Sequence, residues 1–443
     1  MTPVHDFIAI GVGPFNLGLA CLTAPITDLN GVFLEQRDQF AWHPGLMIEG
    51  VTIQVPFLAD LVTMADPASP YSFLNYLKQT GRLYRFYIRE DFYPLRAEYD
   101  AYCRWAAAQL PNIRFGTRIE RIEHDEAGGG YLVHTRAGGT AGTVRARRLV
   151  LGIGTEPNLP APARGLTGPV SHSADYLANK ARLQDLDSIT IIGSGQSAAE
   201  IYLDLLGDID RFGYHLTWAT RSPRFFPMEY TKLTLEMTSP DYIRYFHALP
   251  PASRDRLNRE QRNLYKGISG DLINAIYDLL YQKEVTGPVA TTLLTDTELT
   301  AVTRDDEAGR YRLTLRHREQ DRDFDTTSQG LVLATGYRPR TPEFLDGIRD
   351  RIRWDDHGRF DVATGYSIDT AGTEIFVQNA EEHTHSLTAP DLGMGAYRNS
   401  VIIAAMLGRE VYPIEERIAF QQFGALPQHQ QLDALPQHEA ASR

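Results

Sequence analysis

Short apolar runs that end in glycine punctuate the chain, and two of them predict buried parallel strands that lead into helices. The first run is Phe7–Ile10 before Gly11, and the second is Ile189–Ile192 before Gly193. Runs that are apolar at nearly every position are typical of strands buried on both faces of a parallel sheet. Each run therefore predicts a strand, a tight turn and a helix.

Further apolar segments predict the strands that complete two α/β units. Residues 31–35 and 148–155 accompany the first run, and residues 214–220 accompany the second. A mainly helical insertion interrupts the second unit, because apolar residues recur at helical spacing from Leu272 to Leu280. The predicted fold class is α/β, with two Rossmann-like dinucleotide-binding domains and a mainly helical substrate-binding insertion.

We expect these domains to be interleaved along the chain. A proline-rich link over residues 157–162 leads out of the first domain, and a strand predicted over residues 330–337 leads back into it. The expected bounds are 1–165 and 330–423 for the first domain, 170–228 and 284–329 for the second, 229–283 for the helical insertion, and 424–443 for a flexible tail that repeats Ala-Leu-Pro-Gln-His.

The two glycine segments can each bind the pyrophosphate of a dinucleotide. In the first, Gly11 makes the tight turn and Gly13 lets the backbone approach the phosphates, with Asn16 where a third glycine is usual. Gly193 and Gly195 hold the corresponding places in the second. The helix that follows offers N–H donors and the positive end of its dipole. One such segment can be an ordinary strand-to-helix turn, but two in one chain indicate two dinucleotides.

Side chains beyond each glycine segment distinguish the two cofactors. Glu35 can bind both hydroxyls of an unphosphorylated ribose, which assigns FAD to the first segment. Arg221 and Arg224 follow the corresponding strand of the second unit, where guanidinium groups can bind a 2′-phosphate in two-pronged fashion. The second cofactor is therefore predicted to be NADPH, although two arginines can also form an ordinary solvated turn.

Composition and charge are those of a large enzyme. The chain has 443 residues, 43% of them hydrophobic, which is enough for two or three domains with full cores. A net charge of −12 argues against nucleic acid and an anionic membrane as partners. Cys21 and Cys103 stand in apolar contexts, so we expect buried thiols rather than a disulfide or a metal site. With no signal peptide and no apolar run of about 20 residues, the expected location is the cytoplasm.

Six short motifs are distributed over most of the chain. They are Gly11-Val-Gly-Pro-Phe-Asn-Leu-Gly18, Trp42-His-Pro-Gly45, Pro70-Tyr-Ser-Phe-Leu-Asn-Tyr-Leu77, Tyr99-Asp-Ala-Tyr-Cys-Arg-Trp-Ala106, Gly193-Ser-Gly-Gln-Ser-Ala198 and Ala334-Thr-Gly-Tyr337. Together they resemble the flavin-dependent N-hydroxylating monooxygenases of siderophore biosynthesis, which act on lysine, ornithine or a diamine. The resemblance runs from about residue 5 to about residue 410.

The resemblance implies a mechanism in which the cofactors do the difficult chemistry. NADPH reduces FAD, dioxygen adds to give a C4a-hydroperoxide, and a neutral primary amine attacks its distal oxygen to form an N-hydroxylamine. The protein mainly positions the reactants and excludes water, so no metal and no dedicated nucleophile is expected.

The resemblance also places residues around the flavin. Trp42, His43 and Gln54 map onto positions that flank the flavin and its hydroperoxide, with His43 and Gln54 as the catalytic candidates. Judged without the family, they are an aromatic packing residue, a capping histidine and a solvated strand residue. The expected cofactor-binding residues are Gly11, Gly13, Pro14, Asn16, Glu35, Trp42, His43, Gln54, Gly193, Gly195, Gln196, Ser197, Arg221, Thr335, Gly336 and Tyr337.

One departure from the family pattern bears on the substrate. Lysine and ornithine hydroxylases of the family carry Phe-Leu-Lys-Asp-Leu, whose lysine pairs with the substrate carboxylate, whereas this chain has Ala59 at that position. A buried carboxylate without its partner costs about 2–5 kcal/mol. The expected substrate is therefore a diamine, with cadaverine favoured over putrescine by likeness to the desferrioxamine-type branch. Another cation, such as Lys266 or Arg262, taking over the role would instead favour lysine or ornithine.

The far ammonium of a diamine needs acidic acceptors. Glu381 and Glu382 are the candidates, unless they are simply exposed, and Asp60 is a weaker one because amino-acid hydroxylases carry it too. Two other classes stay open: a Baeyer–Villiger type monooxygenase, and a flavin-binding redox sensor without turnover. Relatives are often tetramers or dimers, so a homo-oligomer is expected.

Overall fold

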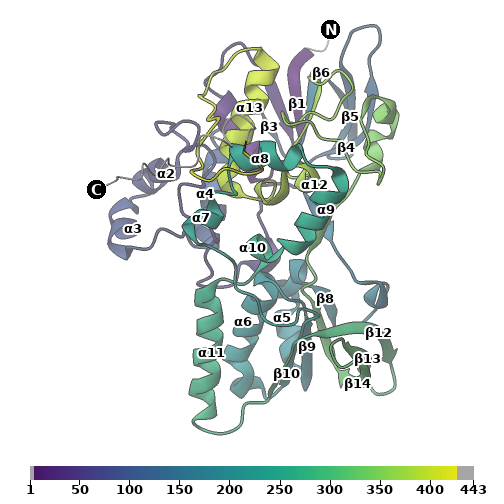
Figure 1. Cartoon of the computed structure of the whole chain (residues 1–443). Helices are drawn as coiled ribbons and strands as arrows, with labels where there is room; N and C mark the ends of the chain where they lie inside the picture. The colour runs from purple at the N-terminus through teal and green to yellow at the C-terminus, as the bar shows by residue number, and fades with distance from the viewer. Residues whose placement is uncertain (1–3, 427–443) are drawn as a thin grey trace, which may run out of the picture.

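The computed structural model describes residues 4–426. Its two largest sheets lie one above the other in Figure 1. The first sheet has the order β3-β2-β1-β6-β5-β4, with β17 beside β6. Its central strand is buried because Phe7, Ile8 and Ala9 are all 0% exposed. The strands are β1 (Val4–Ile10), β2 (Gly31–Leu34), β3 (Ile113–Arg114), β4 (Thr117–His124), β5 (Tyr131–Ala137), β6 (Thr140–Leu151) and β17 (Ile375–Val377).

Two kinds of strand pairing meet in this first sheet. β1, β2, β3 and β17 run parallel to their neighbours, whereas β4, β5 and the start of β6 form an antiparallel meander. The meander is thus an extension of a dinucleotide-type parallel sheet.

The second sheet is entirely parallel and has the order β11-β10-β9-β15-β8. A separate antiparallel meander lies between β11 and β15 in the chain. The strands are β8 (Val170–His172), β9 (Ser188–Ile192), β10 (His215–Ala219), β11 (Thr291–Leu294) and β15 (Gly330–Leu333), with β12 (Thr297–Asp305), β13 (Arg310–His317) and β14 (Arg322–Ser328) in the meander. These two sheets confirm the predicted fold class.

One detail of the predicted organisation is wrong. The strand expected to lead back into the first domain at residue 330 is β15, which pairs with β9 and β8 in the second sheet. Leu331 and Val332 are fully buried in the second sheet. The chain therefore re-enters the first domain after β15. An apolar run before glycine fits either sheet, and pairing alone decides between them.

The chain crosses between the two sheets at two adjacent strands. β7 (Thr155–Pro157) leaves the first domain, and β16 (Tyr337–Pro339) returns to it. They pair antiparallel, with Tyr337 opposite Pro157. The two crossings therefore form one narrow connection.

Helices cover both sheets with apolar stripes. In α6, the residues Ile201, Leu205 and Ile209 recur at four-residue spacing and are buried on the second sheet. The helices of the first domain are α1 (Pro14–Thr23), α2 (Phe73–Gln79), α3 (Leu83–Arg89), α4 (Arg96–Ala107), α12 (Glu382–His385) and α13 (Gly395–Leu407). Those that cover the second sheet are α5 (Tyr176–Gln184), α6 (Gln196–Phe212) and α11 (Gly270–Glu284).

The segment after β10 is helical, and part of it packs against the first domain. Tyr242 and Phe246 form a buried cluster with Leu387, which follows α12. The Nε2 atom of His247 also lies 2.9 Å from the carbonyl oxygen of Val362. The helices of this segment before α11 are α7 (Lys232–Leu235), α8 (Pro240–His247), α9 (Pro251–Glu260) and α10 (Asn263–Lys266).

The cysteines are free and buried, as predicted. Cys21 of α1 and Cys103 of α4 lie in the core of the first domain, and burial raises the pKa of both thiols. Within residues 4–426, no helix is long and apolar enough to cross a membrane. The expected tail lies almost wholly outside the described residues, which end at position 426.

Asp60 organises the loop that follows the Ala59 position. Its Oδ1 accepts hydrogen bonds from the backbone N–H of Val62 at 2.9 Å and of Thr63 at 2.7 Å. Its Oδ2 accepts from the Thr63 hydroxyl and from the N–H of Phe73, each at 2.7 Å. Asp60 is therefore a structural anchor for residues 59–63 and for the start of α2, with both oxygens already engaged.

We expect Asp60→Ala to destabilise the fold. The four donors would lose a buried charged acceptor, which costs on the order of 3 kcal/mol. Thermal unfolding followed by circular dichroism should show a midpoint several degrees lower. Asp66→Ala is the matched control, since Asp66 accepts a single backbone bond at an exposed turn. Equal midpoints for the two variants would contradict the anchoring role.

Candidate active site

The first glycine loop, residues 11–13, is a tight turn between β1 and α1. Gly11 has a φ of 84°, and a Cβ there would lie 2.4 Å from the carbonyl oxygen of Gly152. Gly13 caps α1 and has nothing within 4 Å of a Cβ position, so its outer side is open. Pro14 is the first residue of the helix. The loop therefore presents bare backbone at a helix N-terminus, which is the form that binds a pyrophosphate.

Asn16 fastens this loop from within. Its Nδ2 donates to the carbonyl oxygens of Gly11 at 2.7 Å and Ile10 at 3.3 Å. Its Oδ1 accepts from Nε2 of Gln378, 2.7 Å away and just beyond β17. Asn16 is 1% exposed. The residue expected at a cofactor-binding position thus holds the loop backbone in place.

Glu35 lies at the end of β2 beside the same loop. Its Oε2 accepts the N–H of Val12 at 2.7 Å, and its Oε1 accepts the N–H of Arg37 at 2.9 Å. This is where an acid binds ribose hydroxyls in dinucleotide folds. The loop and the acid fit the adenosine half of FAD.

The second glycine loop, residues 193–195, repeats the arrangement at the end of β9. A Cβ on Gly193 would lie 2.2 Å from the carbonyl oxygen of Ala334, and Gly195 caps α6. Gln196 and Ser197 begin that helix. Gln196 donates from Nε2 to Oε1 of Glu200 at 3.0 Å. The neighbouring strand β10 leads to Arg221 and Arg224, which are both exposed.

Aromatic residues gather where the two domains meet. The ring centroids of Trp42 and His43 are 4.9 Å apart, and those of His43 and Tyr337 are 6.1 Å apart. His172 from β8 lies 5.1 Å from Tyr337 and places its Nε2 3.0 Å from the carbonyl oxygen of Gly336. Thr335 donates from its hydroxyl to the carbonyl oxygen of Asn158 at 2.6 Å. The structure thus joins the expected residues 42–43 and 335–337.

His43 is held in an unusual state for a histidine. It is exposed in the junction and has a left-handed φ of 48°. Desolvation of the ring by the surrounding protein, and then the positive charges of Arg96 and Arg37, lower its pKa to about 4. The ring is therefore neutral at physiological pH and can exchange hydrogen bonds without carrying charge. Gln54, the other catalytic candidate, is half-buried and donates to the carbonyl oxygen of Thr52 at 3.2 Å.

The acidic candidates for the far ammonium already have partners. Oε1 of Glu381 lies 3.0 Å from Nε of Arg398, and both side chains are buried, so Glu381 is not exposed. Glu382 accepts from Nζ of Lys266 at 2.7 Å and from the hydroxyl of Tyr265 at 2.7 Å. The substrate roles of Glu381 and Glu382 stay predictions, and their ion pairs weigh against them. The same pairing occupies Lys266, one of the two alternative cations for a substrate carboxylate, and the other, Arg262, is exposed.

An acid that the sequence analysis missed lies near Ala59. Asp391 is largely buried, and its Oδ1 accepts the N–H of Gly393 at 2.7 Å. A Cβ on Gly393 would be 3.8 Å from the Cβ of Ala59, which is 5% exposed. Desolvation raises the pKa of Asp391. An acid among Pro, Leu and Gly just before an apolar helix was a usable signal, but its nearness to Ala59 exists only in the fold.

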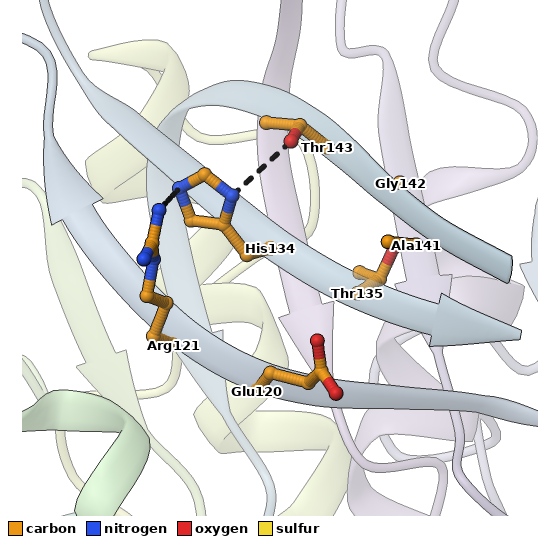
Figure 2. A pocket seen from close by; sticks show the side chains of 7 residues that line it. All are labelled: Glu120, Arg121, His134, Thr135, Ala141, Gly142 and Thr143. Atoms are coloured by element: carbon orange, nitrogen blue, oxygen red, sulfur yellow. Dashed lines mark hydrogen bonds between the residues drawn. The ribbon is translucent and has the colours of Figure 1, made fainter. Parts of the chain in front are cut away.

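One surface pocket lies away from these residues. A pocket of about 370 Å³ opens on the antiparallel meander of the first sheet and is lined by residues of β4, β5 and β6, among them His134 (Figure 2). The His134 ring lies 3.4 Å from Nη2 of Arg121 and 3.2 Å from the hydroxyl of Thr143. Its charges are mixed, and none of the expected site residues lines it. The pocket is therefore separate from the dinucleotide loops.

Comparisons with known proteins agree with this geometry. The family model for L-lysine 6-monooxygenase/L-ornithine 5-monooxygenase matches residues 3–339. The chain is 51% identical to the putrescine N-hydroxylase of Shewanella oneidensis, over 95% of this chain and 84% of that enzyme.

Solved structures agree as well. The chain is 55% identical to the FAD-bound cadaverine monooxygenase DfoA of Erwinia amylovora, with a TM-score of 0.94 over 96% of this chain and 99% of that one. An ornithine N-hydroxylase of Kutzneria sp. 744, with reduced FAD, NADP⁺ and L-ornithine, is 28% identical with a TM-score of 0.85, over 92% of this chain and 99% of that one.

We expect Gly13→Val to fold but to lose flavin. The open side of Gly13 accepts a side chain without touching protein, and that side is where the phosphates must approach. The measurement is flavin absorbance after purification, beside the thermal midpoint. Gly207→Ala is the control, because Gly207 also has nothing within 4 Å but lies in the middle of α6. Full flavin content in Gly13→Val would remove the assignment of FAD to this loop.

Proposed function

Because the chain belongs to the L-lysine 6-monooxygenase/L-ornithine 5-monooxygenase family, we propose that it N-hydroxylates a primary aliphatic diamine with FAD and NADPH. Cadaverine is the favoured substrate and putrescine the next. The product enters synthesis of a hydroxamate siderophore of the desferrioxamine type. The protein is thus an oxidoreductase whose two dinucleotides occupy the two glycine loops.

The observation that carries the substrate class is a reversal of charge at one place. Ala59 stands where amino-acid hydroxylases of the family have a lysine, and a Cβ placed on Gly393 would lie 3.8 Å from Cβ of Ala59 and 3.0 Å from Oδ1 of Asp391. Oδ1 of Asp391 accepts the N–H of Gly393 at 2.7 Å, and burial raises the pKa of this carboxyl while the positive charge of Arg398 lowers it. A site with an acid and without the lysine favours an ammonium and repels a carboxylate.

The chemistry of the substrate fits this reversal. One nitrogen must be neutral to attack oxygen, while the other keeps its proton and needs an acidic partner. Burial raises the pKa of Asp391 although the charge of Arg398 opposes that shift, and a bound ammonium would lower the pKa further. We therefore assign the far ammonium to Asp391, in preference to the paired Glu381 and Glu382.

The cofactors supply oxidising power and the chain supplies position. A flavin held by the first glycine loop and Glu35 would supply the activated oxygen for the amine. Gln54 and the neutral His43 are proposed to hydrogen-bond near the reacting atoms, with Trp42 and Tyr337 enclosing the junction. Glu35 is proposed to bind the ribose of FAD, and Arg221 the 2′-phosphate of NADPH.

The relatives support a diamine over the alternatives. The enzymes at 51% and 55% identity are named for putrescine and cadaverine, whereas the ornithine enzyme is at 28%. Lysine or ornithine as substrate would require another cation, and Lys266 is held by Glu382. A ketone-oxidising enzyme or a sensor without turnover draws no support from the family match.

The test is hydroxylamine formation with NADPH from cadaverine, putrescine, lysine and ornithine side by side. The parent enzyme should prefer a diamine. Asp391→Asn should raise the KM for the diamine roughly thirtyfold or more, because an unpaired buried ammonium costs about 2–5 kcal/mol.

Ala59→Lys should depress diamine hydroxylation, and Ala59→Met controls for bulk without charge. Preference of the parent for lysine or ornithine would overturn the substrate proposal. An unchanged KM in Asp391→Asn would remove the residue assignment alone.

Arg221→Ala should raise the KM for NADPH much more than that for NADH. A lost charge-assisted bond of about 1.5–3 kcal/mol corresponds to a change of roughly tenfold to a hundredfold for NADPH. Arg312→Ala, an exposed arginine on β13, is the control. Equal changes for NADPH and NADH would exclude the 2′-phosphate role.

A further inference from the structure

A short piece of the first domain is built into the core of the second. The 3-10 turn Pro44–Leu46 places Leu46, 4% exposed, in the apolar cluster that includes Tyr176 and Ile201. A Cβ on Gly45 would lie 1.8 Å from the carbonyl oxygen of Ala174, so only glycine allows this approach. The contact is therefore a fitted junction between the domains.

A buried ion pair stands beside this junction and joins the same two domains. Arg96, the first residue of α4, donates from Nη2 to Oε1 of Glu200 at 2.7 Å and from Nη1 to Oε2 at 2.8 Å. Nη1 also donates to the carbonyl oxygen of Leu46 at 2.7 Å. The side chains are 8% and 1% exposed. One guanidinium thus binds the inserted turn and the second domain together.

The carboxylate of this pair belongs to the helix that begins at the second glycine loop. Glu200 lies in the first turns of α6, and its Oε1 also accepts from Nε2 of Gln196 at 3.0 Å. Oε1 of Gln196 accepts the N–H of Ser269, which caps α11, at 2.8 Å. The position of the loop at 193–195 is therefore tied to Arg96 through two side chains.

The N-terminal end of the inserted turn connects to Trp42 and His43, which are expected beside the flavin. His43 caps the turn, and its carbonyl oxygen accepts the N–H of Leu46 at 2.9 Å. Trp42 precedes it and packs on Tyr99 of α4, with ring centroids 5.0 Å apart. Arg96 also helps to lower the pKa of His43. The ion pair and the aromatic residues thus act on one segment.

We propose that Arg96 and Glu200 are positioning residues that set the second glycine loop against Trp42 and His43, and so fix where NADPH meets the flavin. Domains in one chain move relative to each other unless their interface is large and apolar, and within residues 4–426 the backbone links the two sheets through β7 and β16. The apolar contact of Leu46 has no preferred direction, whereas a two-pronged pair does. The proposal rests on the proposed function for its chemistry.

The test uses the full-length holoenzyme and separates geometry from stability. The double variant Arg96→Met with Glu200→Leu replaces the pair by apolar side chains. Such a replacement often keeps the stability of the fold while it removes the directional hydrogen bonds of the pair. The control is Arg351→Met with Glu374→Leu, a pair within the first domain. Anaerobic flavin reduction at saturating NADPH should slow about tenfold or more in the first double variant only, because a misplacement of about 1 Å can cost up to a hundredfold. Hydrogen peroxide formed per NADPH oxidised should rise, with FAD content unchanged.

A second readout needs no cofactor chemistry. Spin labels at Tyr84→Cys on α3 and Tyr281→Cys on α11, both exposed and in different domains, report the distance between the domains. The native thiols are buried and do not interfere. The distance distribution should be narrow in the parent and in the control, and broad in the Arg96→Met, Glu200→Leu variant. An unchanged distribution with an unchanged reduction rate overturns the proposal. A parent that hydroxylates no amine overturns the proposed function and leaves the distance test valid.

Discussion

The two glycine loops lie on two different sheets, and their relative position constrains the other parts of the molecule. Each loop follows from its own strand and helix, but their mutual position does not. Within residues 4–426, the backbone links the two sheets through β7 and β16. The turn at residues 44–46, the Arg96–Glu200 pair and the aromatic cluster at the junction therefore contribute to the relative placement of the two halves, together with α8, which packs against Leu387.

The features that the sequence predicts well are those with local causes. Gly11 and Gly193 are required because a Cβ at either position would lie only 2.4 Å or 2.2 Å from a neighbouring carbonyl oxygen. The buried strands and the two protected thiols follow from apolar runs and apolar contexts in the same way. Ala59 indicates a substrate class only by comparison with the family pattern, since an alanine before an aspartate predicts no function by itself.

The features that the sequence hides are those made by distant partners. Arg96 and Glu200 are separated by 104 positions, and each looks like a surface residue of a helix. The sequence suggests a substrate site or solvent for Glu381, whereas the structure shows it in a buried ion pair with Arg398. The strand at residue 330 was assigned to the wrong sheet, because an apolar run before glycine carries no information about its neighbours.

The burial of the two cysteines has a consequence for durability. A flavoprotein that activates dioxygen releases some peroxide whenever transfer to the amine fails, and peroxide attacks thiolates rather than thiols. Cys21 of α1 and Cys103 of α4 are enclosed in the core and stay protonated because burial raises their pKa. Their burial thereby protects both thiols from oxidation to sulfenic acid.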